Sequence, residues 1–191
     1  MKVTLAKSAG FCYGVRRAVE LAERTAEEGR PCVMLGSIIH NKDVIARLAE
    51  RGLTAVERPE DVPRGSAVII RSHGEGRAVY DQLRARGAEI LDATCPNVTR
   101  IHQIVAQAEQ AGRQPVIVGT PDHPEVTAIA GWCSHPVVVS GAEELEKWLV
   151  QDEKRRNLPL TFVSQTTSTR KIWDDCVKKA KKECTNAEFF D

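Results

Sequence analysis

The stretch Ile90–Arg100 reads Ile-Leu-Asp-Ala-Thr-Cys-Pro-Asn-Val-Thr-Arg and joins a predicted strand to a predicted helix through a cysteine. Its apolar beginning is typical of a buried strand, and Pro96 suits the first position of a helix, where its missing N–H costs no hydrogen bond. Cys95 therefore falls at a strand-to-helix junction. There, unpaired amide N–H groups and the positive end of the helix dipole favour the thiolate, the form of cysteine that attacks or binds metal.

The same arrangement occurs once more, near the N-terminus. Cys12 stands between the short apolar segment 3–6 and a stretch with apolar residues at helical spacing. Shifting the sequence by 83 residues superimposes the two cysteines, and also His40 on His123, without a gap. The same shift pairs Val15 with Val98, Gly29 with Gly112, Arg30 with Arg113, Val33 with Val116 and Gly36 with Gly119. Cysteine and histidine are 28 residues apart in both copies, which indicates an internal repeat that carries chemistry.

Each copy alternates predicted helices with predicted strands in the same order. The pattern predicts strands at 32–35, 54–56, 67–70, 88–95, 115–118, 137–139 and 160–163, separated by amphipathic helices such as 14–28, 77–86 and 96–111. We expect an α/β fold of two pseudo-symmetric βαβ-type units with small, mostly parallel sheets, at residues 13–95 and 96–191. Ligands of such folds gather at the carboxyl ends of the strands.

Composition narrows the class of protein. The 191 residues contain 27 Lys and Arg against 26 Asp and Glu, a net charge of +1 that favours neither nucleic acid nor a membrane surface as a partner. The N-terminus lacks the apolar core of a signal peptide, and no run approaches the roughly 20 apolar residues that span a bilayer. We expect a cytoplasmic protein, in which the six cysteines are free thiols, metal ligands or nucleophiles.

Side chains capable of chemistry follow the ends of the predicted strands. They are Cys12, His40, His73, Cys95, His123, Glu125 and Thr166, the last of which takes the place of His73 in the second copy. Thiolates near a pseudo-symmetry axis, with histidines further out, suit a metal centre beneath an anion-binding pocket. Glu125 has two interpretations from sequence: a general acid in a water-poor site, or a carboxylate that stabilises the first turn of a helix.

The remaining histidines and cysteines lack support from the repeat. We expect His102 and His135 to face solvent or cap a helix. Cys32, Cys133 and Cys176 suit small buried hydrophobic positions.

Six short motifs are distributed along the chain. They are Gly10-Phe11-Cys12-x-Gly14-Val15, Ile39-His40-Asn41, Ser72-His73-Gly74, Asp92-Ala93-Thr94-Cys95-Pro96-x-Val98-Thr99, His123-Pro124-Glu125-Val126 and Gln165-Thr166-Thr167. In order and spacing this set resembles the 4-hydroxy-3-methylbut-2-enyl diphosphate reductase family, which performs the last step of the non-mevalonate isoprenoid pathway. The likeness implies an oxidoreductase.

The resemblance implies a specific reaction and cofactor. The reaction is reductive dehydroxylation of (E)-4-hydroxy-3-methylbut-2-enyl diphosphate to isopentenyl and dimethylallyl diphosphate, with two electrons from a donor such as ferredoxin or flavodoxin. Cys12 and Cys95 would hold a [4Fe-4S] cluster whose remaining iron binds the substrate hydroxyl. His40, His73 and His123 would surround the diphosphate. Glu125 would belong to the proton supply, and Thr166 would lie against the substrate.

The sequence departs from the family in one respect. The family has three cysteine ligands and three α/β units, arranged as a trefoil around a central iron–sulfur site, and this sequence shows two of each. We expect the chain to be truncated before the third unit, with residues 1–12 contributing a strand to that unit. Residues 88–92 align with 187–191, so a third cysteine would fall three residues beyond Asp191. Cys184 precedes the last predicted strand and is not expected to be a ligand, so these residues alone should fold but hold little cluster and be inactive.

Two other classes of function stay open at this point. One is a two-unit iron–sulfur or zinc redox-sensing module. The other is a hydrolase that uses Cys95 as nucleophile and His123 as base.

Overall fold

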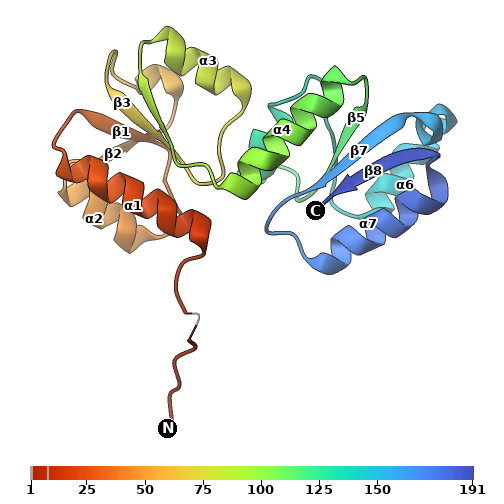
Figure 1. The fold of residues 1–191 in the computed structure, drawn as a ribbon, viewed down its shortest axis with the longest axis horizontal. Helices are drawn as coiled ribbons and strands as arrows, with labels where there is room; N and C mark the ends of the chain where they lie inside the picture. Colours follow the sequence, from red (N-terminus) through yellow and green to blue (C-terminus); the bar gives the residue numbers. More distant parts are fainter. Residues whose placement is uncertain (1, 8) are drawn as a thin grey trace. The chain divides into compact units, whose positions relative to one another are not determined.

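The computed structural model describes residues 2–7 and 9–191. Strands and helices alternate along the chain, as the ribbon in Figure 1 shows. Its first half contains α1 (Tyr13–Glu27), β1 (Cys32–Leu35), α2 (Lys42–Glu50), β2 (Thr54–Val56), the 3-10 helix η1 (Pro59–Asp61), β3 (Ala67–Ile70), α3 (Arg77–Ala85) and β4 (Glu89–Asp92). Its second half contains α4 (Pro96–Gln110), β5 (Gln114–Val118), α5 (Pro124–Ala130), β6 (Val137–Val139), α6 (Ala142–Val150), the 3-10 helix η2 (Glu153–Asn157), β7 (Pro159–Ser164), α7 (Arg170–Glu183) and β8 (Asn186–Phe190).

The strands of the described residues form two four-stranded sheets with the same topology. Their orders are β2-β1-β3-β4 and β6-β5-β7-β8, and every neighbouring pair is parallel. The α/β fold with two repeated parallel sheets, expected from the sequence, is therefore confirmed. In the first sheet Leu35 pairs with Ile70, and Ile70 with Asp92, so these strands end together at one edge. In the second sheet Val118 pairs with Ser164 in the same way.

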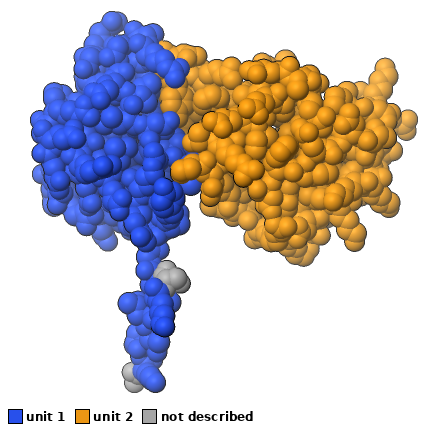
Figure 2. Space-filling model, viewed as in Figure 1, with its two compact units in different colours: residues 1–72, 82–95 blue, residues 73–81, 96–191 orange. Residues whose placement is uncertain are grey.

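The chain divides into two compact units, which Figure 2 distinguishes by colour. Unit 1 comprises residues 1–72 and 82–95, and unit 2 comprises residues 73–81 and 96–191. The division passes through α3, whose residues up to Asp81 belong to unit 2. The expected domains 13–95 and 96–191 share the boundary after Cys95 with these units. The segment 73–81 was expected in the first domain but belongs to unit 2, because most of its contacts are with unit 2 although it follows a strand of unit 1.

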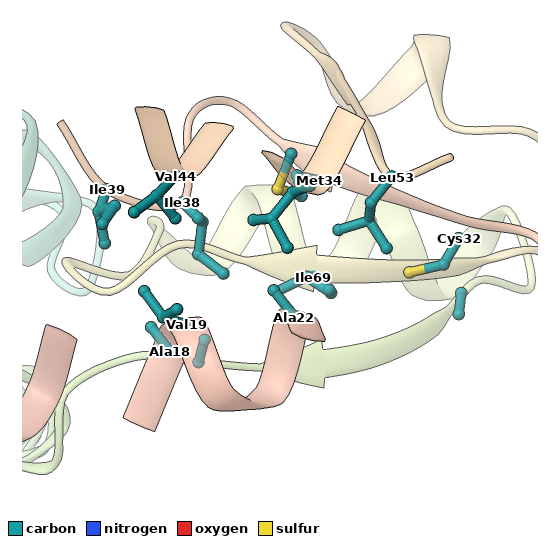
Figure 3. Packing of buried hydrophobic residues seen from close by; sticks show 13 residues of the cluster. Ala18, Val19, Ala22, Cys32, Met34, Ile38, Ile39, Val44, Leu53 and Ile69 are labelled. Carbon is teal, nitrogen blue, oxygen red and sulfur yellow. The ribbon is translucent and has the colours of Figure 1, made fainter. Parts of the chain in front are cut away.

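In unit 1, α1 and α2 cover one face of the sheet. Figure 3 shows this core, in which Ala18, Val19 and Ala22 of α1 belong to the same buried cluster as Met34 of β1 and Ile69 of β3. None of these five side chains is more than 6% exposed. Small residues on the helix let it approach the strands closely, and removal of apolar surface from water stabilises the layer.

Unit 2 buries both faces of its sheet. Val116 and Val118 pack with α6 and α7, whereas Ile117, between them on β5, packs with α4 and α5. This alternation follows from the two-residue period of a strand, which sends successive side chains to opposite faces. A strand with helices on both sides reads as continuous apolar sequence, as Val116–Val118 does.

The N-terminal segment does not form the expected strand within this structure. Residues 2–6 have neither helical nor strand conformation, and Val3 and Leu5 are 80% and 84% exposed. Met1 and Ser8, which also belong to the proposed segment 1–12, lie outside the described residues. The assignment of this segment to a third unit stays a prediction. Among the described helices, none combines the length and the apolar character that a membrane crossing requires.

Candidate functional site

Cys95 is fixed at the carboxyl edge of the sheet of unit 1. β4 ends at Asp92, and the Cys95 N–H then donates a hydrogen bond of 2.8 Å to the carbonyl of Ser72, beyond the end of β3. Arg17 of α1 donates to the carbonyl oxygens of Thr94 and Asp92, at 2.9 and 3.3 Å. These bonds hold the segment between β4 and α4, so the half-buried Cys95 lies directly before the first turn of α4, as the sequence predicted.

The start of α1 lies against this thiol. Cys12 is the N-cap residue of α1, in an extended conformation, and it is exposed. Gly14, in the first turn, is buried, and a Cβ at this position would lie 2.7 Å from the Cys95 Sγ. Only glycine fits there, because 2.7 Å is shorter than any normal contact. Both predicted thiols thus lie in unit 1, at helix N-termini, with the Gly14 backbone packed on the second of them.

His40 occupies the loop between β1 and α2 and is exposed. The next residue, Asn41, caps α2: its side-chain oxygen accepts from the N–H groups of Asp43 and Val44, both at 3.1 Å. Buried Ile38 and Ile39 anchor the loop on the other side. His40 is therefore held between a strand end and a helix start in unit 1. His73, in contrast, belongs to unit 2 and is half-buried.

In unit 2, His123 caps α5 with its ring. The Nδ1 atom accepts a hydrogen bond of 3.1 Å from the Glu125 N–H. A neutral imidazole that accepts at Nδ1 carries its proton on Nε2. The Nε2 edge of the ring is consequently a hydrogen-bond donor. It is suited to bind an anionic oxygen, and it is not suited to act as a base.

Glu125 is 3% exposed, and both of its carboxylate oxygens contact Thr166. Thr166 donates to Oε1 through its backbone N–H at 2.5 Å, and to Oε2 through its hydroxyl at 2.8 Å. Glu125 does lie in the first turn of α5, one of the two interpretations of the sequence, but its oxygens bond to the loop after β7. Because Thr166 itself is exposed, its hydroxyl joins a buried carboxyl group to the surface of unit 2.

Sequence reasoning missed the part played by Gln165. This side chain is 6% exposed; its Oε1 accepts from the Thr120 N–H at 2.9 Å and its Nε2 donates to the Thr167 hydroxyl at 2.6 Å. Gly119 makes room for it, since a Cβ there would lie 2.9 Å from the Gln165 Oε1. Gln165 therefore ties the loop before His123 to the loop after β7. Its place in the motif Gln165-Thr166-Thr167 was the available signal.

A cavity of about 340 Å³ opens in unit 2 beside Thr166. Arg100, Gln165 and Ser168 contribute polar groups to its wall, and Ile101 and Trp173 contribute apolar ones. Cavities of this size and mixed lining suit a small ligand with a charged end.

Comparison with known proteins identifies the family of this chain. The family model described as LytB protein matches residues 3–191. The chain belongs to the LytB protein family.

Several LytB relatives carry the same name, 4-hydroxy-3-methylbut-2-enyl diphosphate reductase. One from Thermoanaerobacter sp. (strain X514) is 38% identical over 194 residues, covering 100% of this chain and 66% of the relative. Another from Clostridioides difficile (strain 630) is 33% identical over 193 residues, covering 100% of this chain and 68% of the relative. The chain thus spans 66% of the length of the first of these relatives.

Two solved structures show the same fold. A structure of (E)-4-hydroxy-3-methyl-but-2-enyl diphosphate reductase, described as the terminal enzyme of the non-mevalonate pathway, matches with a TM-score of 0.83 and 33% identity, covering 98% of this chain and 66% of that one. A reductase from Plasmodium falciparum matches with a TM-score of 0.87 and 27% identity, covering 96% of this chain and 57% of that one.

Few side chains in the described part of this LytB chain are suited to bind a metal ion. No three His, Cys, Asp or Glu side chains of the described part form a group that could hold a metal ion. Burial raises the pKa of the Cys32, Cys133 and Cys176 thiols to about 11, and it also raises the pKa of Cys184. A thiol of that kind stays protonated at neutral pH and is a poor ligand. Exposed Cys12 and half-buried Cys95 are the remaining thiols.

One expectation about the histidines is wrong. His102 does not face solvent: it is 3% exposed, and its ring stacks on Trp132 with centroids 5.1 Å apart. The spacing of residues within α4 explains this burial, because His102 lies on the same helical face as buried Val98 and Val105. His135, by contrast, is exposed as expected.

Thiol reactivity tests this division of the cysteines. In native protein to which no metal has been added, iodoacetamide at pH 7 should modify Cys12 first and leave Cys32 and Cys176 intact. At a pKa of about 11, roughly one thiol in 10,000 is ionised at pH 7, and both side chains are also buried. Mass spectrometry of peptides measures the rates, and protein unfolded in urea, where all six should react alike, is the control. Equal labelling of Cys12 and Cys176 in native protein would contradict the assignment.

Proposed function

We propose that this chain carries the substrate and cofactor residues of a reductase that converts (E)-4-hydroxy-3-methylbut-2-enyl diphosphate to isopentenyl and dimethylallyl diphosphate. Membership of the LytB family and the names of the relatives support the reaction. The observation that carries the proposal is buried Glu125, joined by two hydrogen bonds to exposed Thr166. A carboxyl group in such a place can deliver a proton where a hydroxyl group leaves.

Unit 1 supplies two cysteines suited to bind a [4Fe-4S] cluster. Cys12 and Cys95 would be the ligands, since both stand at helix N-termini and Gly14 keeps the backbone close to the second sulfur. The bound cluster would supply electrons and polarise the hydroxyl group that leaves. The resemblance implies three cysteine ligands, whereas residues 1–191 offer these two, so by themselves they should retain little cluster and no activity.

The reaction needs protons as well as electrons. The carbon–oxygen bond of the allylic alcohol breaks; the hydroxyl takes up one proton and leaves as water, and the allyl group takes up two electrons and one proton. Hydroxide is a poor leaving group, so protonation of the oxygen lowers the barrier. Glu125, protonated on Oε2, is the proposed source of that proton. It would donate to the Thr166 Oγ1 while the Thr166 hydroxyl turns away from Oε2, which it faces in this structure, and gives its own proton to the departing oxygen. The substrate's own diphosphate is the alternative relay.

The histidines would bind the diphosphate. His123 presents an Nε2–H donor, because its Nδ1 is occupied by the Glu125 N–H. We assign His40 and His73 to the same anion from their places at strand ends. Thr166 would lie against the substrate. Binding energy from the diphosphate can hold the reacting carbon in place, which raises the rate without a strongly basic cluster.

Partners follow from the chemistry. A soluble one-electron carrier, such as ferredoxin or flavodoxin, would supply the two electrons in turn. The nearly balanced charge gives no reason to add a nucleic acid or a membrane.

The alternative hydrolase has less support. It would require His123 to accept a proton from the Cys95 thiol, but the Nδ1 of His123 already accepts a hydrogen bond within α5. Its Nε2 then carries a proton and cannot act as a base in the neutral ring.

Metal analysis tests the cofactor proposal. After anaerobic reconstitution with iron and sulfide, the full-length protein should be brown and should reduce the allylic diphosphate with a chemical electron donor. Residues 1–191 alone should lose most of their iron on desalting, because two thiolates leave the cluster open to water and oxygen. About four irons per chain surviving that step would refute the second expectation. A colourless, zinc-loaded full-length protein would instead favour a redox-sensing module.

Replacing Glu125 by Gln tests the proton supply in the full-length enzyme. The variant keeps the size of the side chain and its hydrogen bond from the Thr166 N–H but has no acidic proton. Turnover should fall by at least about 100-fold while the cluster spectrum is unchanged. Thr166→Ser, which keeps the hydroxyl, is the matched control and should retain most activity. Near-normal turnover of Glu125→Gln would reduce its role to stabilising the first turn of α5.

Replacing His40 by Ala tests the binding of the diphosphate. Loss of a hydrogen bond to a charged group should raise KM on the order of tenfold or more, with a smaller effect on kcat. His135→Ala removes an exposed histidine without a proposed role and should leave both constants unchanged. An unaltered KM in His40→Ala would show that this residue does not bind the substrate.

A further inference from the structure

The segment that follows His73 is fastened to the end of α5. The indole N–H of Trp132 donates a hydrogen bond of 2.9 Å to the carbonyl of Glu75. Two residues later, the Arg77 N–H donates to the carbonyl of Gly131 at 3.2 Å. All these residues belong to unit 2, so this pair of bonds is part of one compact body.

Two glycines bring the backbones into direct contact between these bonds. A Cβ on Gly131 would lie 2.6 Å from the Cα of Gly76, and a Cβ on Gly76 would lie 3.1 Å from the Cα of Gly131. A side chain at Gly131 would therefore force the two segments apart. The close approach is what lets the indole of Trp132 reach the Glu75 carbonyl.

The indole itself is held from several directions. The ring of His102, on α4, stacks on it at 5.1 Å with 18° between the planes. The ring of Tyr80 lies at 5.8 Å in a tilted arrangement, and the guanidinium carbon of Arg77 lies 5.4 Å from the centroid of the Trp132 ring. Aromatic and cation–π contacts of this kind favour one orientation of the ring. The donor is thus presented at a fixed point.

The link between this anchor and His73 is short and contains glycine. Gly74, the one residue between His73 and Glu75, has φ +73°, a conformation that favours glycine. A Gly-x-Gly link left without anchors would sample many conformations, and ordering it upon ligand binding would cost entropy. Fixing Glu75 to Arg77 beforehand removes much of that freedom.

We propose that Trp132, together with Gly131, is a positioning pair that sets the backbone after His73 and so holds its imidazole ready for the substrate diphosphate. This inference rests on the proposed role of His73 in binding that anion. The loop that carries Thr166, which stands where His73 stands in the repeat, is fixed by a different device: Glu125 accepts from its backbone N–H. In both of these loops, a side chain from α5 or from the residues just after it binds one backbone group.

Trp132→Phe in the full-length enzyme tests the hydrogen bond. Phenylalanine keeps an aromatic ring but lacks the N–H donor. We expect KM for the allylic diphosphate to rise about fivefold with kcat and the cluster spectrum nearly unchanged, the effect of one neutral hydrogen bond. Hydrogen exchange at the amides of residues 75–77 should become faster in the same variant. Unchanged KM in Trp132→Phe, where His73→Ala raises it, would overturn the inference and leave the proposed function standing.

Gly131→Ala tests the close approach, with a matched control in the same unit. The added methyl meets the Gly76 backbone, so KM and exchange at residues 75–77 should rise as in Trp132→Phe. Gly141→Ala adds the same methyl where nothing lies within 4 Å, at φ 173°, and should leave both unchanged. Equal effects of the two alanines would contradict the proposal.

The double variant His73→Ala/Trp132→Phe separates positioning from a general structural role. If Trp132 acts through His73, the second substitution should add little to the KM of the first. Fully additive effects would show that Trp132 acts on something else and would overturn the inference. If His73→Ala alone left KM unchanged, the proposed role of His73 would fail, and with it the inference that rests on it.

Discussion

Parallel pairing of short strands determines where the loops of both units lie. Among residues 2–7 and 9–191 no strand exceeds six residues, and neighbours in each sheet run in the same direction with their ends in register. All the loops that leave the carboxyl ends within a sheet must then emerge at one edge. In unit 1 that edge carries Cys95 and the loop to His40, and in unit 2 it carries His123 and Thr166. Polar and reactive side chains are brought together there without having to enter the apolar core.

The repeat is preserved in the hydrogen bonds as well as in the order of strands. The N–H of Gly36 donates to the Val56 carbonyl at 2.7 Å, and that of Gly119 to the Val139 carbonyl at 3.0 Å. In both units a Cβ on this glycine would collide with the side chain that follows the adjacent strand, Arg71 in one case and Gln165 in the other. The same glycine position therefore makes room for two different polar side chains in the two units.

The two units differ where chemistry is proposed. The shift of 83 residues places Lys42 on Glu125, so the first turn of α2 carries a cation where that of α5 carries the buried acid. It also places Asn41 on Pro124, a residue without a side-chain acceptor. Asn41 caps α2, whereas in unit 2 the ring of His123 performs this task one position earlier. The cap thereby fixes the imidazole of His123 next to Glu125, with its Nε2 as the hydrogen-bond donor.

The α/β class, the two repeated sheets and their strands could be predicted from the sequence, because apolar periodicity and glycine positions are local and occur twice. The sequence also placed the candidate residues at strand ends, since that position depends only on where each strand stops. The tertiary structure decided which side chains meet: the bond of Glu125 to Thr166 joins residues 41 positions apart, and Trp132 reaches Glu75 across 57. It likewise decided that His102 is buried, although that residue lies on a helical face whose apolar period was visible. Such contacts depend on how separate elements pack, and no local pattern of residues specifies which atom a distant carboxylate or indole will contact.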